Sequence, residues 1–327
     1  MRIATTGSIA TDHLMAFPGR FAEQLVADRL STISLSFLVD GLEVRRGGVA
    51  ANIALGLSRL GLAPLLVGAA GQDFADYRLR LEDSGVDTSG VRISADLQTA
   101  RFVCTTDADS NQIASFYTGA MSEAREIGLA PIAERSGGLD LVVVSPNDPV
   151  AMLRHTAECR SLGIPFAADP GQQIARLDGG ELRQLVDDAW VLFTNEYEAA
   201  LLARHTGWTE DEILARVGTW ITTLGADGVK VSRCGQQPVR IPAVAVPDPV
   251  EPTGLGDAFR AGFLAAVSWG LPAESAARLG CAVASTALRV VGPQDYRIEP
   301  DILTAELRRT YGTDAATELA AFLGRLK

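Results

Sequence analysis

Lysine is almost absent from this 327-residue sequence, in which it occurs only as Lys230 and Lys327. The 29 basic residues face 40 acidic ones, which gives a formal net charge of −11. Nucleic-acid-binding proteins usually carry a basic patch, and this acidic chain has no run of Lys and Arg to form one. Neither lysine follows a glycine as a P-loop requires, and the alternation around Lys230 predicts a strand surface. We therefore expect no nucleic-acid partner and no lysine-based phosphate site.

Long apolar runs and paired cysteines are also missing. The first residues, MRIATTGSIATDHLM, are interrupted by Thr, Ser, Asp and His, so they lack the apolar core of a signal peptide. Apolar stretches such as Phe263–Val267 are too short to cross a bilayer. Four cysteines are scattered without Cys-x-x-Cys spacing: Cys104, Cys159, Cys234 and Cys281. Scattered cysteines are typical of reduced thiols, so we expect a cytoplasmic protein without a membrane partner.

The first third of the chain has mainly the two-residue periodicity of half-exposed strands. This pattern predicts strands at Arg2–Thr6, Ser31–Val39, Leu42–Arg46, Thr99–Thr106 and Gln112–Tyr117. One helical pattern, Gly48–Leu60, stops at Gly61, which suits a residue that ends a helix.

Strands and helices alternate from about residue 125 onward. Leu139–Ser145 is a continuous apolar run, which is typical of a strand buried on both faces of a parallel sheet. Further strands are predicted at Pro165–Ala168, Trp190–Thr194, Thr219–Thr223 and Val229–Arg233. Helices are predicted at Pro149–Leu162, near Gly180–Asp187, from the Thr209–Glu212 capping box, at Gly256–Trp269, at Pro272–Val290 and in the tail.

This alternation predicts an α/β fold with a doubly wound, mainly parallel sheet flanked by helices. The alternating strands of the first third interrupt it twice. We expect them to form a small antiparallel β lid, built from insertions at about 13–46 and 99–118 in a single domain spanning 1–327.

A glycine-rich segment at Glu251–Phe263, EPTGLGDAFRAGF, carries the strongest chemical signal. Gly254 and Gly256 stand where a helical pattern begins, and glycine permits positive φ and close backbone approach. Successive N–H groups at the positive end of a helix can bind an anion without a cationic side chain. Asp257 is then placed to take a proton from a hydroxyl that attacks a phosphoryl group. The alternative is an aspartate that stands there for its favourable interaction with the helix dipole alone.

A second segment, Arg46–Gly61, places Gly47 and Gly48 before a helix whose first turns contain Asn52. Taken alone, it is better explained by helix capping and small-residue packing. Together, however, GGVAANIALGLSRLG and PTGLGDAFRAGF resemble the two signatures of the PfkB (ribokinase-type) kinases, in the family's order.

Two pieces between these signatures extend the resemblance over essentially the whole chain. Asn195-Glu-Tyr-Glu198 is similar to the family's N-x-x-E motif, and Thr223-Leu-Gly-Ala-Asp-Gly228 to its T-x-G-x-x-G nucleotide loop. Stretches such as GSIATDHLMAFPGRF and FAADPGQQIARL look most like bacterial, actinobacterial-type adenosine kinases. A ribokinase-like fold and ATP-dependent phosphorylation of the adenosine 5′-hydroxyl are what this resemblance implies.

The resemblance also implies a role for each matching position. The general base would be Asp257, and the amides of an anion hole would come from Gly254, Leu255 and Gly256. The Mg²⁺ ion would be organised, through water, by Asn195 and Glu198. The nucleotide would contact Asn195, Thr223, Gly225 and Gly228. The sugar hydroxyls would be held by Ser8, Asp12, Gly48 and Asn52; for Asp12 the alternative is turn formation.

The base pocket rests on residue chemistry. Phe102 and Phe116 lie on the two predicted lid strands, where they can stack on a purine or simply pack the lid. Gln172 and Gln173 follow a buried strand, at the edge where doubly wound sheets place ligands, and an amide can both donate to and accept from adenine. Arg176 is the best nearby cation for a transferring phosphoryl group.

The sequence departs from the family pattern at three positions. Glu251-Pro252 stands where the second signature usually has Asp-Thr, and Leu255 where Ala is common. The family's monovalent-cation site lies close by, so the departure disfavours a K⁺ requirement without excluding it. Of the three histidines only His13, next to Asp12, is a site candidate, while the helix patterns around His155 and His205 predict structural roles.

We therefore predict an ATP- and Mg²⁺-dependent adenosine kinase, which the exposed lid strands could bring together as a homodimer. Alternatives are a kinase of the same family acting on ribose, fructose or another nucleoside, and a non-catalytic nucleoside-binding regulator. The intact Asp257, Asn195 and Glu198 argue against the regulator. A dinucleotide-binding oxidoreductase is excluded, because Phe259 stands where the third glycine of its motif belongs.

Overall fold

Two β-sheets organise the chain, and the computed structural model describes them within residues 1–24 and 35–326. In this part of the chain the large sheet has, in spatial order, β13 (Val239–Ile241), β12 (Val229–Ser232), β11 (Thr219–Thr223), β10 (Val191–Asn195), β9 (Phe166–Ala168), β8 (Leu141–Val144), β1 (Ile3–Thr6), β4 (Leu65–Ala70) and β5 (Asp87–Ile93). The small sheet has β3 (Gly41–Gly47), β2 (Ala10–Ala16), β6 (Ala100–Thr106) and β7 (Gln112–Tyr117). The helices are α1 (Phe21–Gln24), α2 (Val49–Arg59), α3 (Ala75–Asp83), α4 (Leu129–Arg135), α5 (Pro149–Leu162), α6 (Gly179–Val186), α7 (Glu196–Thr206), α8 (Glu210–Leu214), α9 (Leu255–Ser268), α10 (Ala273–Ala287), α11 (Pro300–Tyr311) and α12 (Thr313–Leu323).

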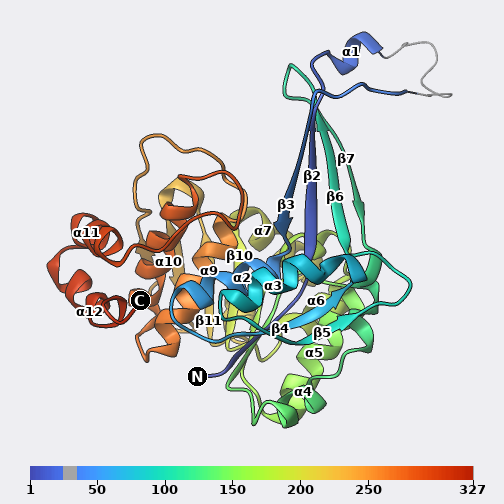
Figure 1. Cartoon of the computed structure of the whole chain (residues 1–327). Coiled ribbons are helices and arrows are strands. Elements are labelled where there is room, and N and C mark those ends of the chain that lie inside the picture. The colour runs from blue at the N-terminus through green and yellow to red at the C-terminus, as the bar shows by residue number, and fades with distance from the viewer. Residues whose placement is uncertain (25–34, 327) are drawn as a thin grey trace.

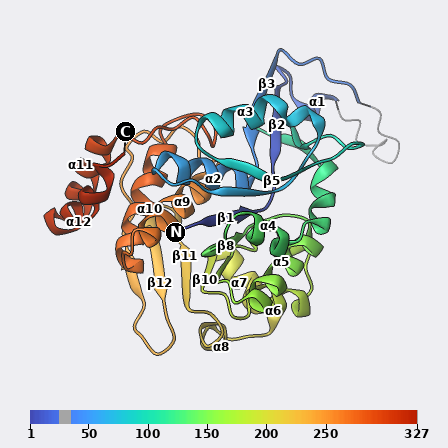
Figure 2. The same cartoon turned by 60° about the horizontal axis from the view of Figure 1, so that its bottom comes forward.

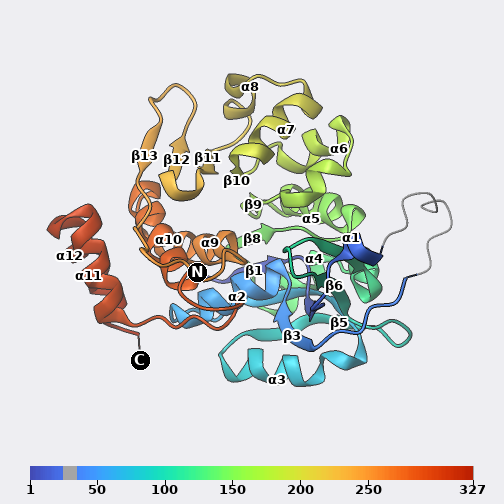
Figure 3. The same ribbon diagram turned by 90° about the horizontal axis from the view of Figure 1, so that it is seen from above.

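The large sheet is parallel from β11 through β5, with β12 and β13 added antiparallel at one edge. Its inner strands are mostly apolar, and all four residues of β8 are buried, because helices cover both faces. The view from above shows α5, α6 and α7 on one side of these strands and α9 and α10 on the other (Figure 3). The predicted doubly wound α/β sheet is confirmed.

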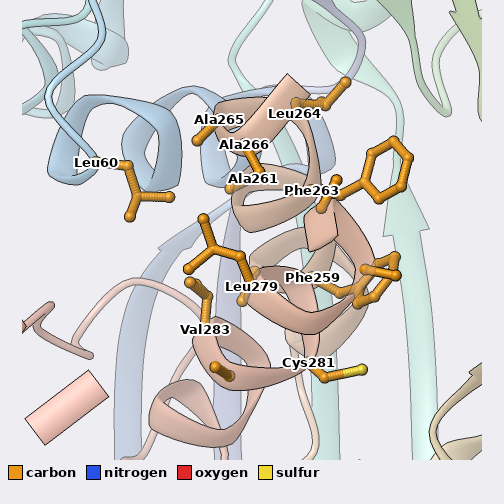
Figure 4. Close-up of a cluster of buried hydrophobic side chains, with 14 of the residues drawn as sticks. Leu60, Phe259, Ala261, Phe263, Leu264, Ala265, Ala266, Leu279, Cys281 and Val283 are labelled. Carbon is orange, nitrogen blue, oxygen red and sulfur yellow. The ribbon is translucent and has the colours of Figure 1, made fainter. Parts of the chain in front are cut away.

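The core on the α9 side is built from closely packed helices. Phe259 and Phe263 of α9 meet Leu279 and Val283 of α10, and Leu60 beyond α2 joins the same cluster (Figure 4). Phe193 of β10 packs edge-on against Phe263, with ring centroids 5.4 Å apart. The helices α11 and α12 lie outside α10, at the periphery (Figure 2). The N-terminus of α9 is therefore held rigidly at the sheet.

The small sheet rises from the body of the molecule (Figure 1). Its outer pairs, β2–β3 and β6–β7, are antiparallel, but β2 and β6 pair in parallel and join the two halves. The predicted antiparallel lid is thus correct for the outer pairs and wrong for the central one, because the two halves come from separate segments of the chain. Its first strand starts at Ala10, slightly before the predicted insertion. The division into one domain with two lid insertions stays a prediction.

One predicted strand is wrong. Within Ser31–Val39, residues 31–34 lie outside the described residues, and 35–39 form no strand. The apolar side chain of Phe37 instead packs with Phe17 and Phe21, at centroid distances of 5.0 and 4.9 Å. The apolar residue Phe37 of this alternating pattern therefore belongs to an aromatic cluster and not to a strand. Short apolar runs are ambiguous between strand and helix, and the elements β4, α3 and β5 were not predicted.

Several helix boundaries follow local signals in the sequence. The helices α6, α7 and α8 each begin with a reciprocal capping box, including the predicted Thr209–Glu212 pair. Gly61 ends α2 with a positive φ of 77°. In the described residues, no helix has both the length and the apolar character needed to span a membrane.

Candidate active site

A cavity of about 470 Å³ opens at the carboxyl end of the large sheet, under the small sheet. Doubly wound sheets bind ligands at this edge, and the volume suits a small molecule. The wall contains eleven of the predicted site residues: Ser8, Asp12, Gly48, Asn52, Phe102, Phe116, Gln172, Gln173, Arg176, Gly254 and Asp257. The structure therefore gathers segments from the whole length of the chain at one place.

The first turn of α9 faces this cavity. Gly254 precedes the helix with φ +78°, and a Cβ there would lie 2.4 Å from Pro293 Cβ, so only glycine fits. The Ala258 N–H donates to Gly254 O at 2.9 Å, which leaves the Gly256 and Asp257 amides as the exposed N-terminal donors of the helix. The Leu255 N–H is directed at Pro252 O, 3.4 Å away. Of the predicted anion-hole donors, the Gly256 amide is the best placed.

Asp257 lies directly at these amides, partly buried in the cavity wall. Removal from bulk water raises its pKa to about 6, while the Arg260 charge and a hydrogen bond from Asn52 oppose the rise. The Asn52 Nδ2 donates to Asp257 Oδ2 at 2.8 Å. Asp257 is therefore ionised at neutral pH and more basic than an ordinary aspartate, as a general base requires.

Asn52 itself is fixed from behind. Its Oδ1 accepts from Gln294 Nε2 at 2.7 Å, and Gln294 also hydrogen-bonds to the Tyr77 hydroxyl. That hydroxyl donates to Gly47 O at 3.0 Å. Asn52 was predicted at the sugar hydroxyls; here its amide is engaged in orienting Asp257.

The predicted sugar-binding residues meet where β1 passes into β2. The Oγ of Ser8 accepts from the Val49 N–H at 3.0 Å, at the start of α2. Gly48 has φ +96°, and a Cβ there would lie 2.5 Å from Ser8 O, which is why glycine stands here. Burial raises the pKa of Asp12 in β2, and the neighbouring Arg45 charge opposes this. Ser8, Asp12 and Gly48 thus form one polar corner of the cavity.

The cavity is also lined by aromatic rings and side-chain amides. Phe102 and Phe116 face each other across β6 and β7, and both line the wall. Gln173 is 4% exposed, and its Nε2 donates to Asn147 O at 2.8 Å. Among the described residues, the Gln173 Oε1 finds no hydrogen-bond partner. Gln172 and Arg176 are exposed at the same rim.

The predicted nucleotide side lies beside this cavity, outside its wall. Asn195 and Thr223 are register partners at the carboxyl ends of β10 and β11. The turn after Thr223 is closed by Leu224 N–H donating to Gly228 O at 2.8 Å, around a 3₁₀ turn that begins at Gly225. Asn195 and Glu198 hydrogen-bond each other reciprocally at 2.8 Å, as the N-terminal cap of α7.

The departure at Glu251 has a structural partner. Its Oε2 lies 2.7 Å from Arg45 Nη1 in the small sheet and accepts the Gly292 N–H at 3.0 Å. Burial would raise the pKa of Glu251, but hydrogen bonds from Thr253 and Gly292 and the Arg45 charge hold it below its usual value. Glu251 thereby ties the small sheet to the loop that precedes the anion hole.

Two histidines lie away from this chemistry. The ring of His13 hydrogen-bonds Thr11 Oγ1 at 3.1 Å and takes no part in the cavity wall, since neighbouring residues of a strand face opposite sides. His155 is buried between Thr6 Oγ1, at 2.6 Å, and Ile127 O, at 3.1 Å, which is a structural role.

A second hollow, of about 570 Å³, lies at the amino ends of β9 to β11. Arg160 and Arg216 line it, but both donate to carbonyls at helix ends, Arg160 to Asp187 O and Arg216 to Glu212 O. It carries none of the predicted site residues.

Four residues around Asp257 were missed from the sequence: Asp169, Arg260, Pro293 and Gln294. Arg260 lies one helical turn after Asp257, a spacing that could have revealed it. Asp169 lies three residues before Gln172, the first of the two glutamines that were singled out. Pro293 and Gln294 carry no local signal, because only the fold brings them to α2 and α9.

The site combines a partly buried carboxylate with the N-terminal amides of a helix, at the carboxyl edge of a doubly wound sheet. This combination defines a class of α/β phosphotransferases in which backbone N–H groups bind the phosphoryl group. Residues 11–299 match the pfkB family of carbohydrate kinases, and the chain belongs to this family. The resemblance inferred from the sequence is confirmed.

The relatives narrow the class further. The chain is 33% identical to the nucleoside kinase of Methanothermobacter thermautotrophicus, over 76% of this chain and 80% of that protein. A structure of the Burkholderia thailandensis nucleoside kinase in complex with inosine is 35% identical, with a TM-score of 0.83 over 95% of this chain and 98% of that one. Bacillus subtilis ribokinase is 29% identical over 76% of this chain and 83% of its own length. The protein is a kinase with phosphotransfer of the nucleoside kinase and ribokinase type.

Proposed function

We propose that this kinase transfers the γ-phosphoryl group of ATP to the 5′-hydroxyl of adenosine, giving AMP and ADP, a purine-salvage reaction. The observation that carries the proposal is the pair Phe102 and Phe116 in the same cavity as Asp257. Stacking contributes about 1–3 kcal/mol per base, whereas a bare sugar needs no such platform. The aromatic pair therefore favours a nucleoside over ribose or fructose.

Gln173 supports a base that brings an N–H donor. The carbonyl of Asn147 can only accept, so the Gln173 amide must turn its Nε2 there and present Oε1 to the cavity side. A buried acceptor left without a donor costs about 1–3 kcal/mol. The 6-amino group of adenine would supply that donor. Hypoxanthine would do so through its N1–H, and inosine, which the Burkholderia thailandensis relative binds, is the nearest competitor.

In the proposed reaction the adenosine 5′-hydroxyl gives its proton to Asp257. Its oxygen forms a bond to the γ-phosphorus in line, as the bond from that phosphorus to the ADP oxygen breaks. The general base contributes about 10²–10⁴-fold. The Gly256 and Asp257 amides and the positive end of α9 stabilise the charge that develops on the transferring group. Asp12 would hold the ribose hydroxyls, and Arg176 would face the phosphates.

Magnesium fits the residues present only as a hydrated, phosphate-bound ion. The capping box uses Asn195 Oδ1 and one oxygen of Glu198, which leaves the second carboxylate oxygen for a coordinated water. No group of three His, Cys, Asp or Glu in residues 1–24 and 35–326 is arranged to hold a metal. Mg²⁺ commonly keeps several waters and binds one or two carboxylates together with substrate phosphates, whose charge it neutralises. We expect activity without K⁺, because Glu251-Pro252 stands where the family's second signature usually has Asp-Thr, close to its monovalent-cation site.

We further infer that the small sheet closes over the nucleoside and limits ATP hydrolysis.

The edge strand of the small sheet, β7, is exposed along its whole length, with Ile113, Phe116 and Tyr117 each more than 40% exposed. Such an edge can pair with a second copy of the chain. A homodimer through these strands is our prediction, and light scattering of the purified protein would decide it.

A coupled assay of ADP release tests the acceptor. The panel is adenosine, inosine, cytidine, ribose and fructose at matched concentrations with Mg·ATP. We expect kcat/KM for adenosine to exceed that for each other acceptor by about tenfold or more. Higher values for inosine or cytidine would replace adenosine as the acceptor, and a preference for ribose or fructose would favour a sugar kinase. Nucleoside binding without ADP release from any acceptor would indicate the non-catalytic regulator.

A further inference from the structure

A second charged side chain lies one helical turn after Asp257 in α9. Arg260 follows Asp257 by three residues, and its side chain is only 11% exposed. The guanidinium folds back toward the helix N-terminus, since a Cβ on Gly256 would lie 2.6 Å from its Nη1. It also lies over the Phe193 ring, 5.5 Å from the centroid. A fixed positive charge therefore sits beside the anion hole of an otherwise acidic protein.

This guanidinium is held by one carboxylate. Arg260 Nη2 lies 2.6 Å from Oδ1 of Asp169, which follows β9 and is 1% exposed. Among the described residues, Asp169 Oδ2 and Arg260 Nε have no hydrogen-bond partner. Burying two charges is costly, and a well-packed apolar pair would often be as stable. A contribution to folding stability is thus a poor explanation for this buried ion pair. Its position beside Asp257 indicates a functional role instead.

The charged and titratable groups facing Asp257 come from several elements. Arg260 lies on its own helix, Asp169 follows β9, and Tyr296 lies between α10 and α11; the charge of Asp257 acts on both Asp169 and Tyr296. Asn52 of α2 contributes an uncharged hydrogen bond. Glu198 of α7 acts on Arg260 and Asp169. Arg176 lines the same cavity but is exposed at its rim, so among these described groups Arg260 is the buried positive charge.

We propose that Arg260, fixed by Asp169, is a positioning residue that keeps Asp257 ionised and aligned for proton transfer. Asp169 restrains the guanidinium at the first turn of α9, so the charge cannot swing out to solvent or onto the phosphates. The inference rests on the proposed function, because it assumes that Asp257 is the general base.

The experiment compares Arg260→Gln, Arg260→Lys and Asp169→Asn by the pH dependence of kcat, adenosine affinity from calorimetry, and thermal unfolding. Loss of the positive charge raises the pKa of Asp257, and protonated Asp257 cannot accept a proton. In Arg260→Gln the acid limb of the kcat profile should move to higher pH by about one unit, which by itself lowers kcat at pH 7 about twofold. Adenosine affinity should stay within about threefold. Arg260→Lys should keep the acid limb near its wild-type position, since the charge remains.

Asp169→Asn should move the limb in the same direction as Arg260→Gln, by a smaller amount. Without Asp169 the guanidinium is no longer held beside Asp257, so the pKa of that carboxyl rises. Loss of a negative neighbour by itself would instead lower this pKa and move the limb to lower pH. The matched control for Arg260→Gln is Arg204→Gln on the exposed side of α7, which also removes one positive charge and should leave the profile unchanged.

An acid limb that stays in place in both Arg260→Gln and Asp169→Asn would overturn the proposal and leave the pair a structural one. If Arg260→Gln does not fold, Asp169→Asn decides alone, and an acid limb that stays in place or moves to lower pH overturns the proposal. Failure of the proposed function is distinguishable, since Asp257→Asn would then retain turnover. If Asp257→Asn is inactive and the acid limb stays in place in the Arg260 and Asp169 variants, only the proposed role of Arg260 is refuted.

Discussion

Asp257 shows how far a local environment can change one side chain. At a helix N-terminus the dipole favours an ionised carboxylate and would lower its pKa. Removal from water acts in the opposite direction and prevails, so the pKa rises to about 6. The side chain therefore remains charged at neutral pH and yet is basic enough to accept a proton from a hydroxyl during transfer.

The first prediction concerns this carboxylate. Asp257→Asn should bind adenosine within about threefold of the wild type but lose about 10²–10⁴-fold in kcat, because the amide cannot take the proton. ADP release and calorimetry measure the two quantities. Asp314→Asn is the matched control, since Asp314 also lies in the first turn of a helix, α12. An Asp257→Asn enzyme that keeps more than about a tenth of the wild-type rate would refute the assignment.

At the scale of elements, the start of α7 combines a structural helix cap with the pair that we propose to organise Mg²⁺. The N-x-x-E motif of the family is also a capping box, and here Asn195 and Glu198 form that box at the start of α7. Thr209 and Glu212 form the same box at the start of α8. The sequence motif alone could not distinguish a cap from a metal-organising pair.

A pair of cap variants separates these roles. Asn195→Ala and Thr209→Ala should each lower the free energy of unfolding by about 1 kcal/mol through loss of the cap. In Asn195→Ala alone, the Mg²⁺ concentration for half-maximal activity should also rise. Urea denaturation and a Mg²⁺ titration of ADP release make the comparison. If both variants depend equally on Mg²⁺, the Asn195–Glu198 pair acts only as a helix cap and does not organise the metal.

At the scale of the whole molecule, an acidic chain handles phosphate without lysine. The net charge is −11, yet the cavity edge combines helix N-terminal amides, Arg176 and the nearby Arg260. The local field at the site is thus set by a few fixed groups. Net charge bears on solubility and on non-specific partners, whereas it says little about one small anion site.

The buried carboxylates also make global stability depend on pH. The pKa of Asp257 is about 6 in the folded chain against an ordinary 3.8, so between these values the folded state binds more protons than the unfolded state. The free energy of unfolding therefore falls as pH rises through this window. Asp257→Asn should be more stable than the wild type at pH 7, by up to about 3 kcal/mol, and nearly equal to it at pH 4. Urea denaturation at both pH values measures this, and a difference independent of pH would contradict it.

The sequence by itself determined the features that depend on local spacing. Apolar runs such as that of β8 indicated a parallel sheet, capping boxes placed the starts of helices, and Gly254 with Asp257 marked the start of α9, where we propose the anion hole. These signals are contained in short windows, because period, caps and positive φ are properties of neighbouring residues. The family followed from four such windows in the right order.

Only the tertiary structure decided what depends on distant segments. It paired β2 with β6 in parallel, and it set Phe37 in an aromatic cluster instead of a strand. It also brought Asp169 to Arg260 and Gln294 to Asn52, although each pair is far apart in the chain. Sequence periodicity carries no information about which partner a charge or amide will meet, since that depends on how the layers pack. The environment of Asp257, and hence its basicity, is therefore a property of the fold.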